Sequence, residues 1–219
     1  RMLNLSPGPT PRRELEPLPQ PRWAVKARAE VLDQPVIAAP SVLRAAGQTR
    51  AFANVLGTVR HGLQQNDRLI VVTGDSGTGK TLLCRALMEE ADPRLHMSVM
   101  LQPPATPEDL LAQFLRDVGV LDNGTSAMLM SRNSLMLALQ RFLESLIPLR
   151  RRAVMVIDEA QHLTPMVLEQ LRLALNFETG DAALLQVVLV GQPELDTLLR
   201  WPELKRVAQR ISMRLAVLP

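Results

Sequence analysis

The sequence predicts an α/β fold in which a parallel sheet carries helices on both faces. Short runs rich in Val, Ile and Leu alternate along the chain with longer segments whose apolar residues recur at helical spacing. Strands that alternate with helices pair in parallel, because each helix returns the chain to the same edge of the sheet. At 219 residues, 47% of them hydrophobic, the chain can bury one sizeable core. We therefore expect a single folded domain with additional segments.

The first 40 residues differ in composition from the rest of the chain. They hold eight of the seventeen prolines and few apolar residues. Proline removes backbone donors, and a segment with little apolar surface cannot offset the entropy of ordering. We predict a proline-rich, disordered extension over residues 1–40 and a folded core over residues 41–219.

The first half of the core is expected to contain three helices and two strands. Apolar residues at helical spacing predict a helix over 42–63 with a break near Gly47. The β-branched run "RLIVVTG" is typical of a buried strand. Thr106 and Pro107 mark the start of a helix, as an N-cap and a first helical residue. The expected strands here are 68–74 and 95–102, and the expected helices are 42–63, 80–91 and 106–120.

The second half continues the alternation. A helix is expected to end before Pro148, and another to begin at Thr164 and Pro165. The run "LLQVVLV" is apolar in six of its seven positions and predicts a buried strand. The expected helices are 131–147 and 164–178, followed by a helical stretch over 193–209. The expected strands are 151–160, 184–190 and 211–218.

Charge and cysteine content exclude several classes of protein. Residues 1–30 carry a surplus of three positive charges, and the remainder holds nineteen basic and nineteen acidic residues. The pI near 9.7 is therefore no evidence by itself for nucleic-acid binding. The single Cys84 excludes an internal disulfide, and no apolar run approaches the roughly 18–20 residues that span a bilayer. A cytoplasmic location is the expectation.

A glycine-rich segment separates the first strand from the helix that follows it. Its sequence, "GDSGTGKT" at residues 74–81, matches G-x-x-x-x-G-K-S/T in full. Such a loop points its backbone N–H groups at phosphate oxygens, and the next helix adds its positive end. Lys80 is expected to contact the β- and γ-phosphates of ATP, and Thr81 to bind Mg²⁺. The predicted nucleotide-binding residues are Gly74, Asp75, Ser76, Gly77, Thr78, Gly79, Lys80, Thr81 and Leu82.

A pair of carboxylates follows the third strand in "VMVIDEAQHL". Asp158 is placed to bind the magnesium ion through water, and Glu159 to activate a water for attack on the γ-phosphate. This pair argues for hydrolysis, since binding alone would not require Glu159. The letters DEAQ are also typical of helicases, but a helicase of that kind needs two such halves and this chain is long enough for one.

The fourth strand ends at a polar residue. Residues 184–190 run directly into Gly191, Gln192 and Pro193. The succession of strands resembles that of the AAA+ superfamily, in which a polar residue at the tip of the fourth strand senses the γ-phosphate. The resemblance implies this role for Gln192, with Gly191 giving the backbone room and Pro193 starting the next helix.

Several of these segments together resemble a known family. "GDSGTGKT", "VIDEAQHL", "LRLALNFET", "LLQVVLVGQPELDTLL" and "LKRVAQRISMRLAVLP" are similar to the ATPase domain of the ExeA / general secretion pathway A family of AAA+ proteins, whose core is shared by TniB/TnsC-type transposition ATPases. The resemblance covers about residues 42–219. It implies an AAA+ P-loop NTPase with a parallel five-stranded sheet in the order 5-1-4-3-2, using ATP and Mg²⁺, with catalytic roles for Glu159, Lys80 and Gln192. The helical lid of that family would follow Pro219 and is expected to be absent from this chain.

The resemblance also implies self-assembly. In AAA+ proteins an arginine before the fifth strand contacts the ATP of a neighbouring copy, and "KRVAQRISMR" offers Arg206, Arg210 and Arg214. We expect Arg210 to be this arginine finger in a ring or filament of identical copies. Gln102, at the end of the second strand, is a candidate to hold Glu159 away from water.

Three functions remain open from the sequence. The first is an ATPase that drives or licenses assembly or remodelling of a larger secretion-type complex, in the cytoplasm or peripheral to the inner membrane through partners. The second is an ATP-dependent, DNA-binding regulator of transposition, favoured by basic clusters over residues 150–152 and 200–214. The third is a nucleotide-dependent interaction module that hydrolyses poorly, which a phosphate-release assay separates from the first.

Overall fold

The computed structural model describes residues 50–89, 91–122, 130–179 and 182–217. The predicted extension over residues 1–40 and the predicted break near Gly47 lie outside these ranges. The strands are β1 (Leu69–Gly74), β2 (Leu95–Met100), β3 (Arg152–Ile157), β4 (Glu178–Thr179), β5 (Ala182–Ala183), β6 (Leu185–Gly191) and β7 (Ile211–Val217). The helices are α3 (Arg50–Gln64), α4 (Lys80–Glu89), α5 (Pro107–Asp117), α6 (Arg132–Leu146), η2 (Ala160–His162), α7 (Pro165–Ala174), α8 (Glu194–Leu199), η3 (Pro202–Leu204) and α9 (Lys205–Ala208).

The five longer strands form one parallel sheet in the order β2-β3-β6-β1-β7. Numbered as the five strands that the sequence predicts and read from the β7 edge, this order is 5-1-4-3-2. The predicted sheet order is therefore confirmed. Strands β4 and β5 form a separate antiparallel pair of two residues each, which the sequence pattern did not predict.

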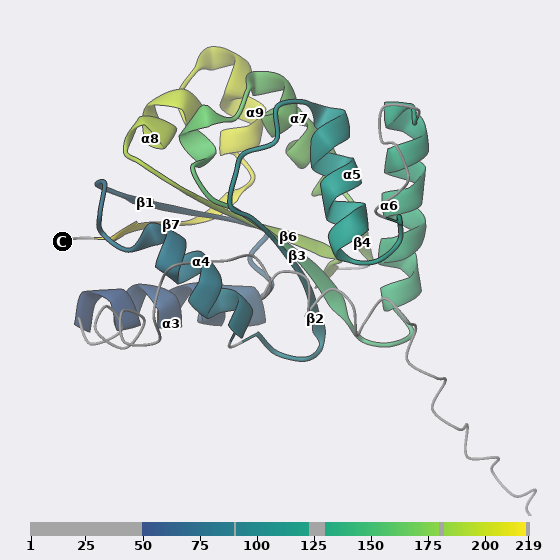
Figure 1. The fold of residues 1–219 in the computed structure, drawn as a ribbon, viewed down its shortest axis with the longest axis horizontal. Coiled ribbons are helices and arrows are strands. Elements are labelled where there is room, and N and C mark those ends of the chain that lie inside the picture. The colour runs from purple at the N-terminus through teal and green to yellow at the C-terminus, as the bar shows by residue number, and fades with distance from the viewer. Residues whose placement is uncertain (1–49, 90, 123–129, 180–181, 218–219) are drawn as a thin grey trace, which may run out of the picture.

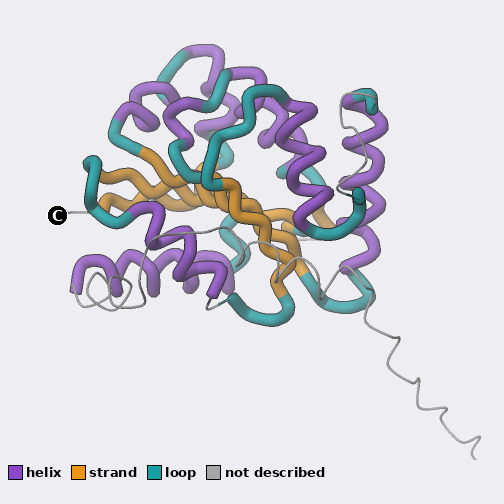
Figure 2. The backbone as a smooth tube through the Cα atoms, viewed as in Figure 1, coloured by secondary structure: helices purple, strands orange, loops and turns teal. Residues whose placement is uncertain are grey.

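The sheet is the middle layer of three (Figure 1). Helices α3 and α4 cover one face, and helices α5 to α9 cover the other, as the backbone in Figure 2 also shows. Strand β1 explains this arrangement, because side chains alternate across a strand. Leu69 and Val71 pack in the larger core on the α5–α9 side, whereas Ile70 and Val72 pack in the smaller core with α3 and α4.

The helix starts that depend on capping are confirmed. The hydroxyl oxygen of Thr106 accepts the backbone N–H of Asp109 at 3.1 Å, and Pro107 is the first residue of α5. Thr164 caps α7 in the same way. The helical stretch expected over 193–209 is present but divided into α8, η3 and α9. Pro202 supplies the reason, since proline disfavours helical backbone at the residue before it.

The parallel topology brings the carboxyl ends of β3, β6 and β1 to one edge of the sheet. The glycine-rich loop follows β1, the Asp158–Glu159 pair follows β3, and Gln192 follows β6. Ligand sites of open α/β sheets lie at this edge. Within the described residues, no helix is both long and apolar enough to cross a bilayer.

Candidate functional site

The glycine-rich loop connects β1 to α4 and has the conformation of a phosphate cradle. Gly77 and Gly79 have φ angles of 81° and 88°, in the left-handed region that only glycine adopts without strain. Thr78 closes the turn, donating from its backbone N–H and its hydroxyl to the carbonyl oxygen of Asp75 at 3.3 and 2.8 Å. Helix α4 begins at Lys80, so its unpaired N-terminal N–H groups lie next to the loop.

Lys80 lies folded over this loop. Its ammonium group donates to the carbonyl oxygen of Asp75 at 2.7 Å, and the residue is only 6% exposed. An ammonium group has three N–H donors. A phosphate group in the cradle can therefore take the place of the Asp75 carbonyl, or share the ammonium with it, without a large movement of the side chain.

Thr81 and Asp158 meet although 77 residues separate them in sequence. The Thr81 hydroxyl donates to Oδ2 of Asp158 at 2.5 Å, and Oδ1 of Asp158 accepts the backbone N–H of Glu159 at 2.9 Å. A hydroxyl and a carboxylate oxygen are hard oxygen ligands of the kind that Mg²⁺ uses together with water and substrate phosphates. Mg²⁺ sites of this type need no cluster of three acidic, His or Cys side chains, and the described residues contain none. The two residues thus fit a magnesium site beside the phosphate cradle.

The buried environment of Asp158 disfavours the charged form of its carboxyl group. The residue is 1% exposed, and burial raises the pKa of its carboxyl above the usual value, with a further rise from the nearby Glu159. The Thr81 hydrogen bond, the Glu159 N–H and the charge of Lys80 oppose this rise. A divalent cation at the carboxylate would favour its charged form in the same way.

Glu159 lies at the edge of the site in an unusual backbone conformation. Its φ and ψ of 51° and 35° are left-handed, which is uncommon for a residue with a side chain. Its Oε2 accepts a hydrogen bond from Nε2 of Gln161 at 2.6 Å. Oε1 of Gln161 accepts the backbone N–H of Gln192 at 3.0 Å. Glu159 and the tip of β6 are thereby joined through one glutamine side chain.

Gln161 is the site residue that the sequence interpretation missed. Its only signal is its place in "DEAQ", because its second partner, Gln192, lies 31 residues away, directly after β6. Gln192 does lie at the strand tip, as expected, and its backbone N–H donates to Oε1 of Gln161. Gln161 bonds Oε2 of Glu159, the carboxylate that Gln102 was proposed to hold, and Gln102 itself is exposed, so its role stays a prediction.

The three candidate finger arginines do not lie together. Arg210 directly precedes β7 and donates to Oδ1 of Asn176 at 2.7 Å. Because β7 runs parallel to β1, Arg210 is at the amino end of the sheet and the phosphate loop at the carboxyl end. The six residues of β1 span about 20 Å at roughly 3.3 Å per residue, so Arg210 cannot reach the loop of its own chain.

The other two arginines have different surroundings. Arg214 is within β7 and forms an ion pair with Asp196 of α8, which also accepts a hydrogen bond from Thr73 at 3.4 Å. Arg206 is exposed on α9, where its charge helps lower the pKa of Glu169 after the larger effect of the Arg172 hydrogen bond. Of the three, Arg210 directly precedes β7 at the amino end of the sheet, and Arg214 is held to its own α8.

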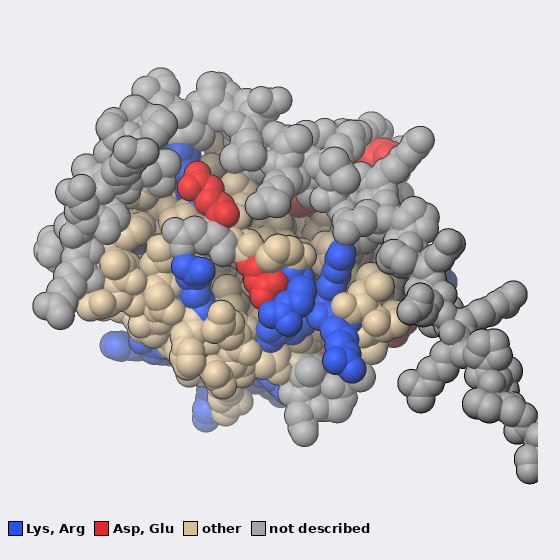
Figure 3. All heavy atoms as spheres, turned by 90° about the horizontal axis from the view of Figure 1, so that it is seen from below, with Lys and Arg blue, Asp and Glu red and all other residues tan. Residues whose placement is uncertain are grey.

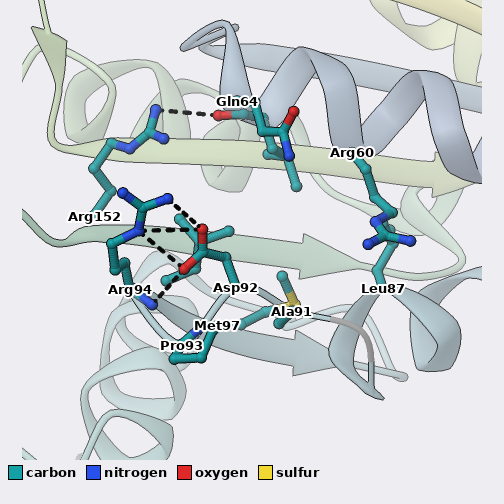
Figure 4. A pocket seen from close by; sticks show the side chains of 11 residues that line it. Arg60, Gln64, Leu87, Ala91, Asp92, Pro93, Arg94, Met97 and Arg152 are labelled. Carbon is teal, nitrogen blue, oxygen red and sulfur yellow. Dashed lines mark hydrogen bonds and ion pairs between the residues drawn. The ribbon is translucent and has the colours of Figure 1, made fainter.

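A second hollow, of about 640 Å³, lies at the amino ends of β2 and β3, away from the phosphate loop. Figure 3 shows basic groups gathered beside acidic ones on the face seen from below, and Figure 4 shows the hollow itself. Arg94 pairs with Asp92 at 2.7 Å, and Arg152 donates to the carbonyl oxygen of Leu63 at the end of α3 at 3.1 Å. Both arginines are thus paired with groups of the same chain, and none of the predicted nucleotide-binding residues lines this hollow.

Comparison with known proteins agrees with the geometry of the phosphate site. A family model described as an AAA domain matches residues 63–199, which include the phosphate loop, Asp158, Glu159 and Gln192. The chain is 38% identical over 164 residues to General secretion pathway protein A of Aeromonas hydrophila. The match covers 75% of this chain and 29% of that protein. The chain thus spans less than a third of the length of this curated relative.

Solved structures share the fold at low sequence identity. The ORC2 protein of Aeropyrum pernix in its ADP form has a TM-score of 0.57 and 15% identity, covering 79% of this chain and 48% of that one. Cdc6p of Pyrobaculum aerophilum has a TM-score of 0.56 and 19% identity, covering 75% and 44%. A Drosophila ORC structure bound to DNA has a TM-score of 0.55 and 18% identity, covering 98% and 37%. At these identities the likeness shows the arrangement of the strands and helices.

Proposed function

We propose, since this chain belongs to the AAA domain family, that it binds ATP with Mg²⁺ and hydrolyses it to ADP and phosphate. The contact between Thr81 and Asp158 carries this proposal. It joins the end of the phosphate loop to the end of a neighbouring strand, where a nucleotide-bound cation would lie. A loop that bound only an anion would not need a buried carboxylate beside it.

Each residue has a distinct role in the proposed reaction. The loop N–H groups and Lys80 hold the phosphates, and Thr81 and Asp158 hold Mg²⁺, which offsets the charge of the phosphate oxygens. Glu159 accepts a proton as a water oxygen attacks the γ-phosphorus. The bond from the γ-phosphorus to the bridging oxygen breaks, and ADP leaves with that electron pair. Gln192 is proposed to lie next to the γ-phosphate at the tip of β6.

Glu159→Gln tests this assignment. The variant keeps the size of the side chain but removes the proton acceptor, so we expect ATP binding within about threefold of the wild type and a fall in kcat of at least about 10²-fold. Phosphate release and binding of a fluorescent ATP analogue measure the two quantities. Hydrolysis at the wild-type rate in this variant would exclude Glu159 as the base.

The wider role proposed for the chain is an ATPase that self-assembles and drives or licenses assembly or remodelling of a larger secretion-type complex, in the cytoplasm or at the inner membrane through its partners. The identity to General secretion pathway protein A supports the secretion-type reading. Self-assembly is supported by Arg210, which lies at the opposite end of the sheet from its own phosphate loop. An arginine in this place can act on ATP only in another copy.

A second candidate function is ATP-dependent DNA binding, as in a regulator of transposition. It is favoured by the two basic clusters over residues 150–152 and 200–214, since residues 150–152 at the start of β3 and Arg210 at the start of β7 both lie at the amino end of the sheet. An electrophoretic mobility-shift assay tests this function. The protein is mixed with duplex DNA and ATP at salt concentrations from about 50 to about 200 mM. Binding that weakens steeply with salt would favour it, and no binding at the lowest salt would exclude it.

A further inference from the structure

We propose that Gln161 is a positioning residue that ties the carboxylate of Glu159 to the tip of β6, so that the placement of the base depends on the strand end proposed to sense the γ-phosphate. This inference rests on the proposed function and adds a means of regulation at the same site. It is carried by two hydrogen bonds from opposite ends of one side-chain amide, to Glu159 at 2.6 Å and from Gln192 at 3.0 Å.

The direction of these two hydrogen bonds is determined by chemistry. A backbone N–H can only donate, so the Gln192 N–H requires the carbonyl end of the Gln161 amide. The NH₂ end of the amide is then turned to Glu159, whose ionised carboxylate can only accept. A hydrogen bond to an ionised acceptor is stronger than one between neutral groups. Glutamine therefore fits both partners in one orientation, which neither glutamate nor leucine can do.

Gly191 provides an independent observation. A Cβ atom at this position would lie 2.6 Å from Oε1 of Gln161 and 3.2 Å from Cδ2 of Leu195. The tip of β6 is thus shaped to let the Gln161 amide approach the backbone. The left-handed backbone of Glu159 also indicates that this residue is held in position, because strained conformations persist where the surroundings hold them in place.

The arrangement has a mechanical consequence. A displacement of the β6 tip when a γ-phosphate binds or leaves would move the Gln192 N–H, and with it the amide that holds Glu159. Small errors in the position of a catalytic group can cost about 10²-fold in rate. Gln161 would in this way make the position of Glu159, the proposed base, depend on whether a γ-phosphate is bound.

Three variants of Gln161 separate its two hydrogen bonds. Gln161→Leu removes both of them at similar volume, Gln161→Glu keeps the acceptor for Gln192 but loses the donor to Glu159, and Gln161→Asn keeps both groups on a shorter side chain. We expect Leu and Glu to lower kcat by about 10- to 100-fold with KM within about threefold, and Asn to recover part of the loss. Gln140→Leu is the matched control, because Gln140 donates to Glu144 at 2.8 Å on the surface of α6 and should leave kcat unchanged.

A change on the other side of the contact gives a second measurement. Gly191→Ala should push the Gln161 amide away and lower kcat to a similar extent, whereas Gly57→Ala, with open space around its Cβ, should not. The Gly191→Ala change should cost less in a Gln161→Ala background, where the clashing oxygen is gone and only the longer contacts, to Leu195 and to the Gln161 backbone nitrogen, remain. Thermal unfolding of each variant separates a loss of fold from a loss of positioning.

The proposal requires that Gln161 act through Glu159. Single-turnover rates should show that Gln161→Leu costs almost nothing further in a Glu159→Gln background. Wild-type kcat in Gln161→Leu, a raised kcat, or an equal loss with and without Glu159 would each overturn the proposal. None of these results affects the proposed function, which fails separately if the wild-type chain hydrolyses no ATP.

Discussion

At the scale of single residues, the site combines burial with charge. Asp158 is almost fully buried and its pKa is raised by that burial, yet it accepts two hydrogen bonds that favour its charged form. A buried carboxylate is costly unless it is paired or binds a cation. Asp158 is therefore placed where Mg²⁺ would relieve an unfavourable environment, and its burial is consistent with a binding role.

His96 gives a prediction of pH-dependent stability at this scale. Its ring packs edge-on against Phe142 with centroids 5.9 Å apart, and burial, with a smaller contribution from Arg151, lowers its pKa from 6.5 to about 4. The unfolded chain takes up this proton at a higher pH than the folded one, so stability should fall as the pH drops from about 6.5 towards 4. Because the ring is only partly buried, solvent screening reduces the effect, and we expect a loss on the order of 1 kcal/mol. Urea unfolding across this range should show a shallower loss for His96→Phe than for the wild type.

At the scale of elements, helix α5 depends on its first turn. The Thr106 hydroxyl accepts the N–H of Asp109 and donates to its carboxylate at 2.7 Å, and Glu108 and Asp109 place negative charge at the positive end of the helix. Buried residues of α5 then pack against the larger core. The cap thus determines where a core helix begins.

Thr106→Ala should lower the free energy of unfolding by about 1 kcal/mol, because it leaves a helix N–H without its acceptor. Thr106→Ser keeps the oxygen and should lose much less. Chemical denaturation measures both variants. Equal stability of Thr106→Ala and the wild type would show that water replaces this cap without cost.

At the scale of the whole molecule, the sheet separates the phosphate loop from Arg210. Hydrolysis that uses this arginine must therefore involve two copies, and specific activity should rise with protein concentration. Arg210→Ala should leave ATP binding by the monomer unchanged and remove this rise, with a loss of about 10³-fold if the arginine contributes as measured fingers do. Arg206→Ala and Arg214→Ala are compared in the same assay. Activity per subunit that never depends on concentration would exclude a finger in trans.

The sequence was sufficient for the parts of the fold that depend on local pattern. Apolar β-branched runs indicated the five longer strands, and threonine followed by proline located the starts of two helices. The phosphate loop and the Asp158–Glu159 pair could be predicted to lie together, because parallel strands bring their carboxyl ends to one edge. The break at Pro202 was missed although proline disfavours helical backbone at the residue before it, and the β4–β5 pair was missed because strands of two residues carry too little pattern to be recognised.

The sequence by itself determined the class of the fold, the order of its elements and the residues of the phosphate and carboxylate motifs. Only the tertiary structure decided which groups touch. It paired Gln161 with both Glu159 and the tip of β6, and it held Arg214 to Asp196 while placing Arg210 at the far end of the sheet. The physical reason is that motifs express local spacing and backbone geometry, whereas the Gln161–Gln192 and Arg214–Asp196 contacts join residues far apart in sequence, which meet only when the helices have packed on the sheet.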